Sequence, residues 1–304
     1  MLRKIIKGLN RKSSRSSGML ALYISKSDLR LVDVETATIT HFRSESYDAD
    51  SLKQALHTLL SSVTKHRKLH IVLSPDFYQL VQIDKPALSE TEMLQALPWQ
   101  VKDLVDISPD DIIADYIDLP SYNSQTSKIN VVVASTSWLK QLVQYVTSSE
   151  LHIHSIQPEE WLAMGLIAPT GQATMLVIHQ PENELLIQIV RDGQLYFSRR
   201  ARGFGQLHLS TEAELRDDSL DRLQLELQRS MDYFESQLKQ PPVRDIRLLM
   251  AQSALITDLL RQNGFGRVEP LANLPLAQAL STEQLISCWP GVAVLNRSDS
   301  ESVA

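Results

Sequence analysis

The chain has little glycine and almost no cysteine. Only ten of its 304 residues are glycine, well below the roughly 7% typical of folded proteins, and this scarcity argues against several phosphate-binding loops. The single cysteine, Cys288, excludes a disulfide framework and a cysteine metal cluster, and it indicates a reducing compartment. No apolar run approaches the roughly 20 residues needed to span a bilayer.

The charge is unevenly distributed along the chain. Residues 1–17 carry six basic residues and no acid, so 24 of the 30 basic residues remain for the rest of the chain, against 36 acidic residues. This body therefore has a charge of −12, which argues against nucleic-acid binding because that needs an extended positive surface. The length predicts two domains, with room for an insert.

The first residues predict a short amphipathic helix with basic residues opposite its apolar stripe. Such a segment can contact an anionic membrane surface. The contact residues would be Leu2, Arg3, Lys4, Ile5, Ile6, Lys7 and Leu9. The alternative is a solvated tail, because one weak helix rarely anchors a protein alone.

One order of elements is predicted twice. Strands at 20–24, 29–34 and 38–42 precede a helix at 49–63 and a strand at 69–73. Strands at 174–179, 184–190 and 194–200, with a hairpin turn at Asp192-Gly193, precede a long helix at 219–240 and a strand at 244–249. A helix at 253–263, a strand at 267–271 and a helix at 276–286 follow. A repeated β-β-β-α-β-α unit predicts the α/β actin-like fold, a duplicated RNase H-like plan.

A different unit interrupts the first half. We predict a β-α-β-β-α subdomain with strands at 77–83, 112–119 and 128–135 around a polar loop at 121–127, and a last helix at 137–148. Its first helix starts at Ser89, with Glu92 at the reciprocal capping position, and should kink or restart at Pro98. A strand at 152–157 and a helix at 158–166 then lead to the second half.

These patterns give five segments. They are a basic N-terminal segment (1–18), a first actin-like domain (19–75 plus 151–170), the inserted subdomain (76–150), a second actin-like domain (171–295) and a polar, frayed tail (296–304).

Three stretches resemble the PilM family of type IV pilus inner-membrane assembly proteins, in particular its MSHA-pilus branch. Residues 92–105 (EMLQALPWQVKDLV), with Ser108-Pro109-Asp110-Asp111 and Asp115-Tyr116, are similar to the signature of the family's inserted subdomain. Residues 226–234 (ELQRSMDYF) are similar to its long helix, and residues 190–200 to its second-domain hairpin. The resemblance covers residues from about 19 to about 295.

The family's phosphate-binding positions are altered in this chain. Where the family has an acid and a glycine at the first turn, the chain has Tyr23 and Ser25, with Ser27 following. At the second turn it has His179 and Pro181, and the glycines near the adenosine are replaced by Met250, Ala251 and Gln252. A Cβ blocks close approach of backbone to a phosphate, and proline lacks the N–H donor. Without the acids, ligands for magnesium are lost. We therefore expect no cofactor, and disfavour ATP with Mg²⁺.

The resemblance implies a function in assembly. Members of the family bind the N-terminal cytoplasmic tail of a PilN-like, single-pass membrane protein, in a groove between the first domain and the inserted subdomain. The chain is thus expected to be a non-enzymatic scaffold, cytoplasmic and peripheral at the inner membrane, that can also meet pilus motor or platform proteins. The alternatives are a working ATPase and the cytoplasmic component of type II secretion that resembles GspL.

Trp99, Leu104 and Val105 are the candidate partner-binding residues, because Trp is over-represented where proteins bind partners. The alternative for Trp99 is a residue of the small subdomain's core. His152 and His154 share a strand face and could ligate a metal, but no third ligand is evident, so a solvated face is favoured and no metal is expected.

Overall fold

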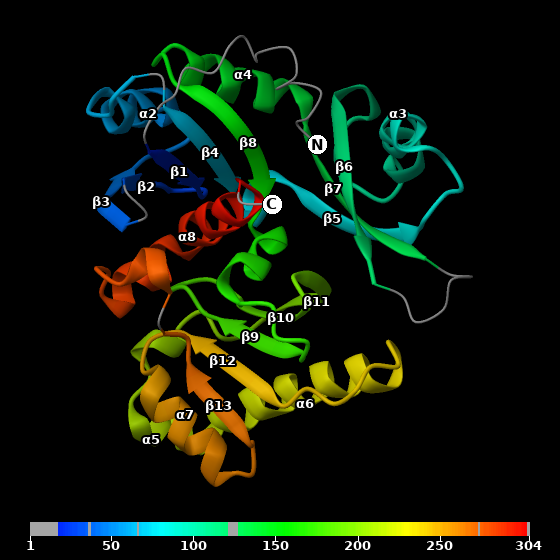
Figure 1. Ribbon diagram of the computed structural model, residues 1–304, viewed down its shortest axis with the longest axis vertical. Helices are drawn as coiled ribbons and strands as arrows, with labels where there is room; N and C mark the ends of the chain where they lie inside the picture. Colours follow the sequence, from blue (N-terminus) through cyan, green and yellow to red (C-terminus); the bar gives the residue numbers. More distant parts are fainter. Residues whose placement is uncertain (1–17, 36–37, 66, 121–126, 273, 303–304) are drawn as a thin grey trace. The chain divides into compact units, whose positions relative to one another are not determined.

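A computed structural model describes residues 18–35, 38–65, 67–120, 127–272 and 274–302. The chain divides into two compact units (Figure 1). Unit 1 comprises Met1–Leu119, Asn123–Leu162 and Pro290–Ala304, and unit 2 comprises Pro120–Tyr122 and Ala163–Trp289. The basic N-terminal segment and most of the predicted loop at 121–127 lie outside the described residues.

Unit 1 contains a mixed five-stranded sheet of order β3-β2-β1-β4-β8. Strands β1 (Met19–Ile24), β2 (Asp28–Glu35) and β3 (Thr38–Ser46) form an antiparallel meander, and β4 (Lys68–Leu73) and β8 (His152–Pro158) continue it in parallel. Nearly every side chain of β1 and β4 is buried, as expected of central strands covered on both faces. Helix α2 (Leu52–Ser61) buries its apolar stripe beside β2 and β3.

Unit 2 contains a second five-stranded sheet, of order β11-β10-β9-β12-β13. Its strands are β9 (Thr174–Ile178), β10 (Leu185–Arg191), β11 (Gln194–Ala201), β12 (Asp245–Leu249) and β13 (Arg267–Pro270). Again three antiparallel strands are followed by two parallel ones. The duplicated plan predicted from the sequence is confirmed. The predicted turn at Asp192-Gly193 is also confirmed, with φ of 50° and 71°.

Two long helices complete the core of unit 2. Helix α6 (Leu220–Ser236) directs Leu223, Leu227 and Phe234 into this core, and α7 (Ser253–Gln262) contributes Ile256 and Leu260. A short α5 (Glu212–Glu214) and a π-helical turn, η6 (Leu215–Ser219), precede α6. Helix α6 ends at Ser236, before the predicted Gln240, because the chain turns at Lys239 with φ of 53° ahead of two prolines.

The insert forms a three-stranded antiparallel sheet, ordered β5-β7-β6, with α3 packed on β6. Its elements are β5 (Gln79–Asp84), α3 (Glu90–Val101), β6 (Ile112–Leu119) and β7 (Lys128–Ser135). Helix α4 (Thr136–Thr147), predicted as the last helix of the insert, contacts α2 and β8 as well as β7. The capping box of Ser89 and Glu92 is confirmed. The predicted restart at Pro98 is wrong: α3 is continuous, because Met93, Leu97 and Val101 bury one face against the sheet.

Two other predictions were wrong. Residues 158–166 form two separate 3₁₀ turns, η3 (Glu159–Trp161) and η4 (Ala163–Leu166), in place of one helix. The last helix, α8 (Thr282–Ser302), starts later than predicted, after the 3₁₀ turn η7 (Pro275–Ala277), and extends through most of the segment predicted as a frayed tail. Its buried residues from Val292 to Leu295 explain why the helix continues past its predicted end at residue 286.

Candidate functional site

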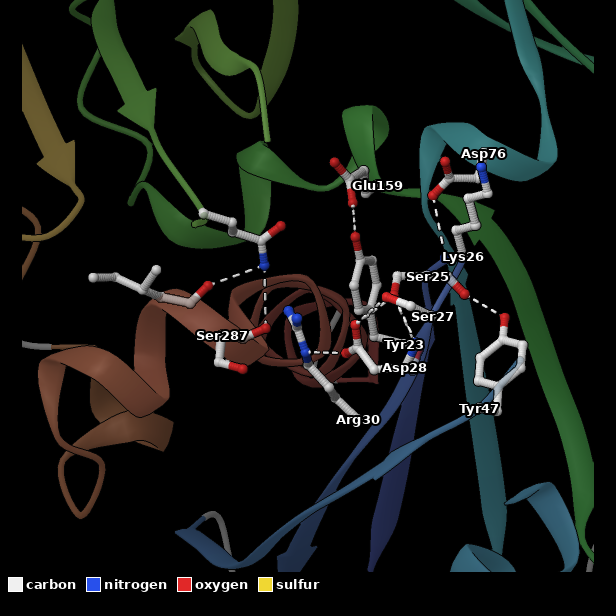
Figure 2. Close-up of polar contacts among 12 residues, drawn as sticks. Tyr23, Ser25, Lys26, Ser27, Asp28, Arg30, Tyr47, Asp76, Glu159 and Ser287 are labelled. Carbon is white, nitrogen blue, oxygen red and sulfur yellow. Dashed lines mark hydrogen bonds and ion pairs between the residues drawn. The ribbon is translucent and has the colours of Figure 1, made fainter. Parts of the chain in front are cut away.

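The turn between β1 and β2 uses its own side chains to satisfy its backbone. Ser25 N–H donates to the carbonyl of Asp28 at 3.0 Å, and Asp28 N–H donates to Ser25 Oγ at 3.1 Å. Ser25 Oγ in turn donates to the Asp28 carboxylate at 2.7 Å. Two donors that a phosphate would need are therefore already occupied (Figure 2).

A second carboxylate closes this turn from the start of the inserted subdomain. Asp76, in the 3₁₀ turn η1 (Pro75–Phe77), accepts a hydrogen bond from Lys26 N–H at 3.2 Å (Figure 2). It also accepts one from Ser74 Oγ at 2.6 Å. The Asp76 carboxylate thus takes the backbone donor of the middle turn residue. The Asp76 carboxylate also places a negative charge at the turn, which would repel a phosphate.

Tyr47 also hydrogen-bonds to this turn. Its hydroxyl donates to the carbonyl of Ser25 (Figure 2). Burial raises the pKa of Tyr47 to about 12, and the carboxylates of Asp28 and Asp76 add to the shift. The hydroxyl therefore stays protonated and remains a donor to the turn at any physiological pH.

Tyr23 is the first of the altered positions predicted from the sequence. Its hydroxyl donates to Glu159 Oε2 at 2.6 Å, and both side chains are buried (Figure 2). On the other side the Arg30 guanidinium lies 5.5 Å from the centre of the Tyr23 ring and 2.5 Å from the Asp28 carboxylate. The Glu159 carboxylate therefore lies beside position 23, but it already accepts a hydrogen bond from the Tyr23 hydroxyl.

The turn after β9, in unit 2, is also closed by local contacts. His179 is fully buried and its ring stacks near that of His208, with 6.0 Å between centroids. Burial lowers the pKa of His179 to about 4, and His208 contributes in the same direction, so the ring is neutral. After Pro181, Glu182 adopts a φ of 65° and its N–H donates to the carbonyl of Gly205 at 3.0 Å.

The turn between β12 and α7 keeps a conformation that favours glycine without having one. Gln252 has a φ of 55°, in the left-handed region. Its side-chain amide donates to the carbonyl of Ser210 at 2.8 Å, while Met250 is buried in the core of unit 2. A side chain therefore fills the space that a glycine would leave open to a ligand.

The inserted subdomain has an exposed apolar patch at the C-terminal end of α3, which we define as Trp99 and Leu104. Their exposed fractions are 69% and 55%. Leu88 is also exposed, at 41%, but it precedes the start of α3. Trp99 is thus not a core residue; its ring contacts only Lys102 among the aromatic and cation–π contacts of the described residues, at 5.7 Å. Val105, also predicted to bind a partner, packs partly against the subdomain core. A large exposed aromatic side chain such as Trp99 is typical of protein-binding surfaces.

No family model and no curated protein matches the chain. Among solved structures, its fold is similar to a chain of the PilM-PilN type IV pilus biogenesis complex, with 18% identity, coverage of 93% of this chain and 98% of that one, and a TM-score of 0.65. It is also similar to the cytoplasmic domain of EpsL, an inner-membrane component of the type II secretion system of Vibrio cholerae (13% identity, 89% and 93% covered, TM-score 0.52). A Bacteroides thetaiotaomicron protein of unknown function with an actin-like ATPase fold matches as well (12% identity, 90% and 96% covered, TM-score 0.50).

The fold is actin-like. The predicted fold class is therefore confirmed, with two mixed five-stranded sheets and a small antiparallel subdomain. At these identities the likeness establishes the fold and leaves the function to be argued from the chain's own residues.

Sequence reasoning missed Glu159 and Asp76 as residues of the first turn. Glu159 lies 136 positions from Tyr23 in sequence, and only the parallel pairing of β4 with both β1 and β8 brings the two together. Asp76 follows a strand that the sequence predicts to be buried. No sequence pattern links it to Lys26, so its hydrogen bond to the turn could not be predicted.

The sequence predicted that His152 and His154 lie on a solvated strand face and bind no metal. Both are exposed, and the His154 ring lies 4.8 Å from the ring of the buried His70. No group of three or more His, Cys, Asp or Glu able to hold a metal occurs among the residues that the structure describes.

None of the described helices is long and apolar enough to cross a membrane. The predicted membrane-contact residues, Leu2 to Leu9, lie outside the described part of the chain.

Proposed function

We propose that the chain is a non-enzymatic scaffold of a type IV pilus assembly platform, on the cytoplasmic side of the inner membrane. In this proposal it binds the N-terminal tail of a PilN-like single-pass membrane protein. It would be an MSHA-type member, close to MshI. The likeness to the PilM-PilN complex over 93% of the chain supports the assignment to an assembly platform.

The observation that carries the proposal is the exposed patch of Trp99 and Leu104 at the C-terminal end of α3. Apolar side chains of this size are normally buried, and a tail that covered them would gain the free energy of removing that area from water. Asp103 is exposed beside the patch, where Lys102 also lies over the Trp99 ring, and Glu90 and Glu92 are exposed at the other end of α3. Cytoplasmic tails next to a membrane span are enriched in Lys and Arg. An apolar part of such a tail suits Trp99 and Leu104, and its basic residues suit the acids along α3.

Trp99→Ala tests the partner-binding patch. A synthetic peptide of a candidate tail should bind the variant about tenfold or more weakly, because an exposed Trp at such a site supplies a large share of the affinity. Isothermal calorimetry gives the affinity. Leu209→Ala is the matched control, since Leu209 is equally exposed (66%) in unit 2. Unaltered tail affinity in the Trp99 variant, with a large fall in melting temperature, would show that Trp99 serves stability alone.

We also propose that the chain does not bind a magnesium nucleotide. The donors of Ser25, Lys26 and Asp28 are occupied by the chain itself, and Asp76 adds negative charge. Calorimetry with Mg-ATP should detect no binding tighter than about 1 mM. ATP turnover that a substitution in the 23–27 turn abolishes would instead establish the alternative, an active ATPase.

The second candidate is a component of type II secretion similar to GspL, favoured by the likeness to EpsL. Tail peptides from pilus and secretion partners, compared in the same titration, separate the two. The segment 1–17 would add a contact with anionic lipid in either case. Pelleting with anionic vesicles, before and after removal of residues 1–17, tests that contact.

A further inference from the structure

Unit 2 has a surface pocket of about 450 Å³ that none of the three turns uses. It lies where α6, the start of β12 and the turn from α7 to β13 meet. Its volume is in the range of sites that bind small ligands or single side chains of a partner. Met231, Val243 and Phe265 form its apolar wall, and Arg244 and Arg267 stand among its polar residues.

The charge of the pocket is positive. Two arginines line it, and none of its lining residues is acidic. Arg267 has a long ion pair, 3.7 Å, with Asp245 and is 67% exposed, so this pair contributes little. Within the part of the chain that the structure describes, Arg244 forms no ion pair. In a body with a charge of −12, two arginines facing one pocket without acidic neighbours in its lining form a complementary site for an anion.

The apolar wall limits which ligands fit the pocket. Val243 is buried, and Met231 and Phe265 are partly buried against the core of unit 2. Methionine adapts its shape to different apolar groups. A ligand that satisfies both parts of the pocket has a carboxylate next to an apolar side chain.

The rim indicates that the ligand is part of a larger molecule. Gln228, Asn263, Gly264 and Gly266 line the pocket and are all exposed. A small molecule in so open a site would leave much of its surface in water, unlike the usual 70–90% burial of such ligands. An extended peptide that lies across the rim and inserts one side chain does not need that enclosure.

We propose that this pocket is a docking site for a short acidic peptide segment of a second protein, with an apolar anchor between its carboxylates. The arginines contact the carboxylates and the Met231–Phe265 wall receives the anchor. The site lies in unit 2 and is distinct from the patch of the inserted subdomain, so it does not depend on the tail binding proposed above.

Binding of a defined probe tests the proposal. The probe is a fluorescein-labelled octapeptide of alternating Glu and Leu, and the control probe replaces each Glu with Lys. Fluorescence anisotropy with the full chain should show binding of the Glu peptide that weakens with salt, and no binding of the Lys peptide. Free glutamate at the same carboxylate concentration should fail to compete. Equal binding of both peptides, or of neither, overturns the proposal, and effective competition by glutamate reassigns the pocket to a free acid.

Three variants test whether the Glu peptide binds in this pocket. Arg244→Glu should weaken binding about tenfold, because it reverses one of the two attractive charges. Arg202→Glu makes the same change in charge at an exposed residue outside the pocket and should leave affinity unchanged. Gly266→Trp keeps every charge and should block the anchor; a Cβ there meets no atom within 4 Å, so the fold tolerates it. Affinity unaltered in both pocket variants would place the peptide elsewhere and refute the assignment.

Discussion

At the scale of single residues, the first turn shows how a few side chains change what a backbone can bind. Ser25 and Asp28 satisfy each other, and Asp76 accepts from the Lys26 N–H. None of these contacts needs a strained residue. The turn keeps the shape of a hairpin while its donors and its charge no longer suit a phosphate.

Tyr23→Phe should destabilise the protein. It removes the hydroxyl that donates to the buried Glu159 carboxylate at 2.6 Å. Losing a hydrogen bond to a buried charged group costs about 1.5–3 kcal/mol of unfolding free energy. Urea unfolding measures the change. Tyr145→Phe is the control, since the Tyr145 hydroxyl accepts a hydrogen bond from the exposed Gln141 at 2.6 Å. Equal stability of the two variants would mean that the Glu159 carboxylate does not depend on Tyr23.

The residue scale also sets the limit of sequence reasoning about the site. The replacement of glycines and acids at positions 23, 25, 179 and 181 could be read from the sequence, since it concerns local turns. The replacement contacts could not, because Glu159 and Asp76 are brought in by strand pairing over long separations. The sequence also could not predict that Trp99 is exposed, because the same helix buries other apolar residues, Met93 and Leu97.

At the scale of elements, periodicity predicted the strands and the amphipathic helices well. β6 and β7 have the predicted bounds, and α2, α4 and α7 differ by a few residues at their ends. The errors lie where tertiary packing competes with local preference. Residues 159–166 bury Trp161 and Leu162 in short turns rather than along a helix, and α8 continues because its residues after Pro290 are buried in unit 1.

Gly291→Val tests the packing of α8 in unit 1. A Cβ at Gly291 would lie 3.0 Å from Val32 Cγ2 and 3.3 Å from Ala21 Cβ, so β1 and β2 approach the helix too closely for a branched side chain. Overpacking of this kind costs about 1–3 kcal/mol of unfolding free energy. Urea unfolding of Gly291→Val and of the control Gly266→Val, where a Cβ meets nothing within 4 Å, gives the comparison. A Gly291 variant as stable as the control would show that α8 can move away from the sheet.

At the scale of the whole molecule, the same sheet order occurs twice while the binding turns of both units are altered. The sheets need only their apolar strands and helix faces, which the sequence retains throughout. A phosphate site needs particular glycines and acids in three turns, and each can be lost without cost to the core. The fold could therefore be predicted from the sequence, whereas the proposed loss of nucleotide binding rests on residues that the fold does not require.

Buried histidines in both units make overall stability depend on pH. His70 in unit 1 has a pKa lowered to about 3, mainly by burial and then by His154 and Lys68, and the pKa of His179 in unit 2 is lowered to about 4. Both imidazoles titrate near pH 6.5 in the unfolded chain. Below that pH the unfolded chain binds more protons than the folded one, so the unfolding free energy should fall by about 1.4 kcal/mol per pH unit for each group.

Urea unfolding at intervals between pH 7 and pH 5 measures this dependence. The window lies above the range in which carboxylates such as Glu92 and Glu214, whose pKa values are lowered, take up protons. His70→Gln removes one titrating group, keeps an amide that can bond Ser155 in place of the ring nitrogen, and should halve the slope. His41→Gln, at an exposed position of β3, should leave the slope unchanged. If stability were flat across this window in the unmodified chain, the two imidazoles would have to accept protons in the folded state, and the turn after β9 would then carry a positive charge that could attract a phosphate.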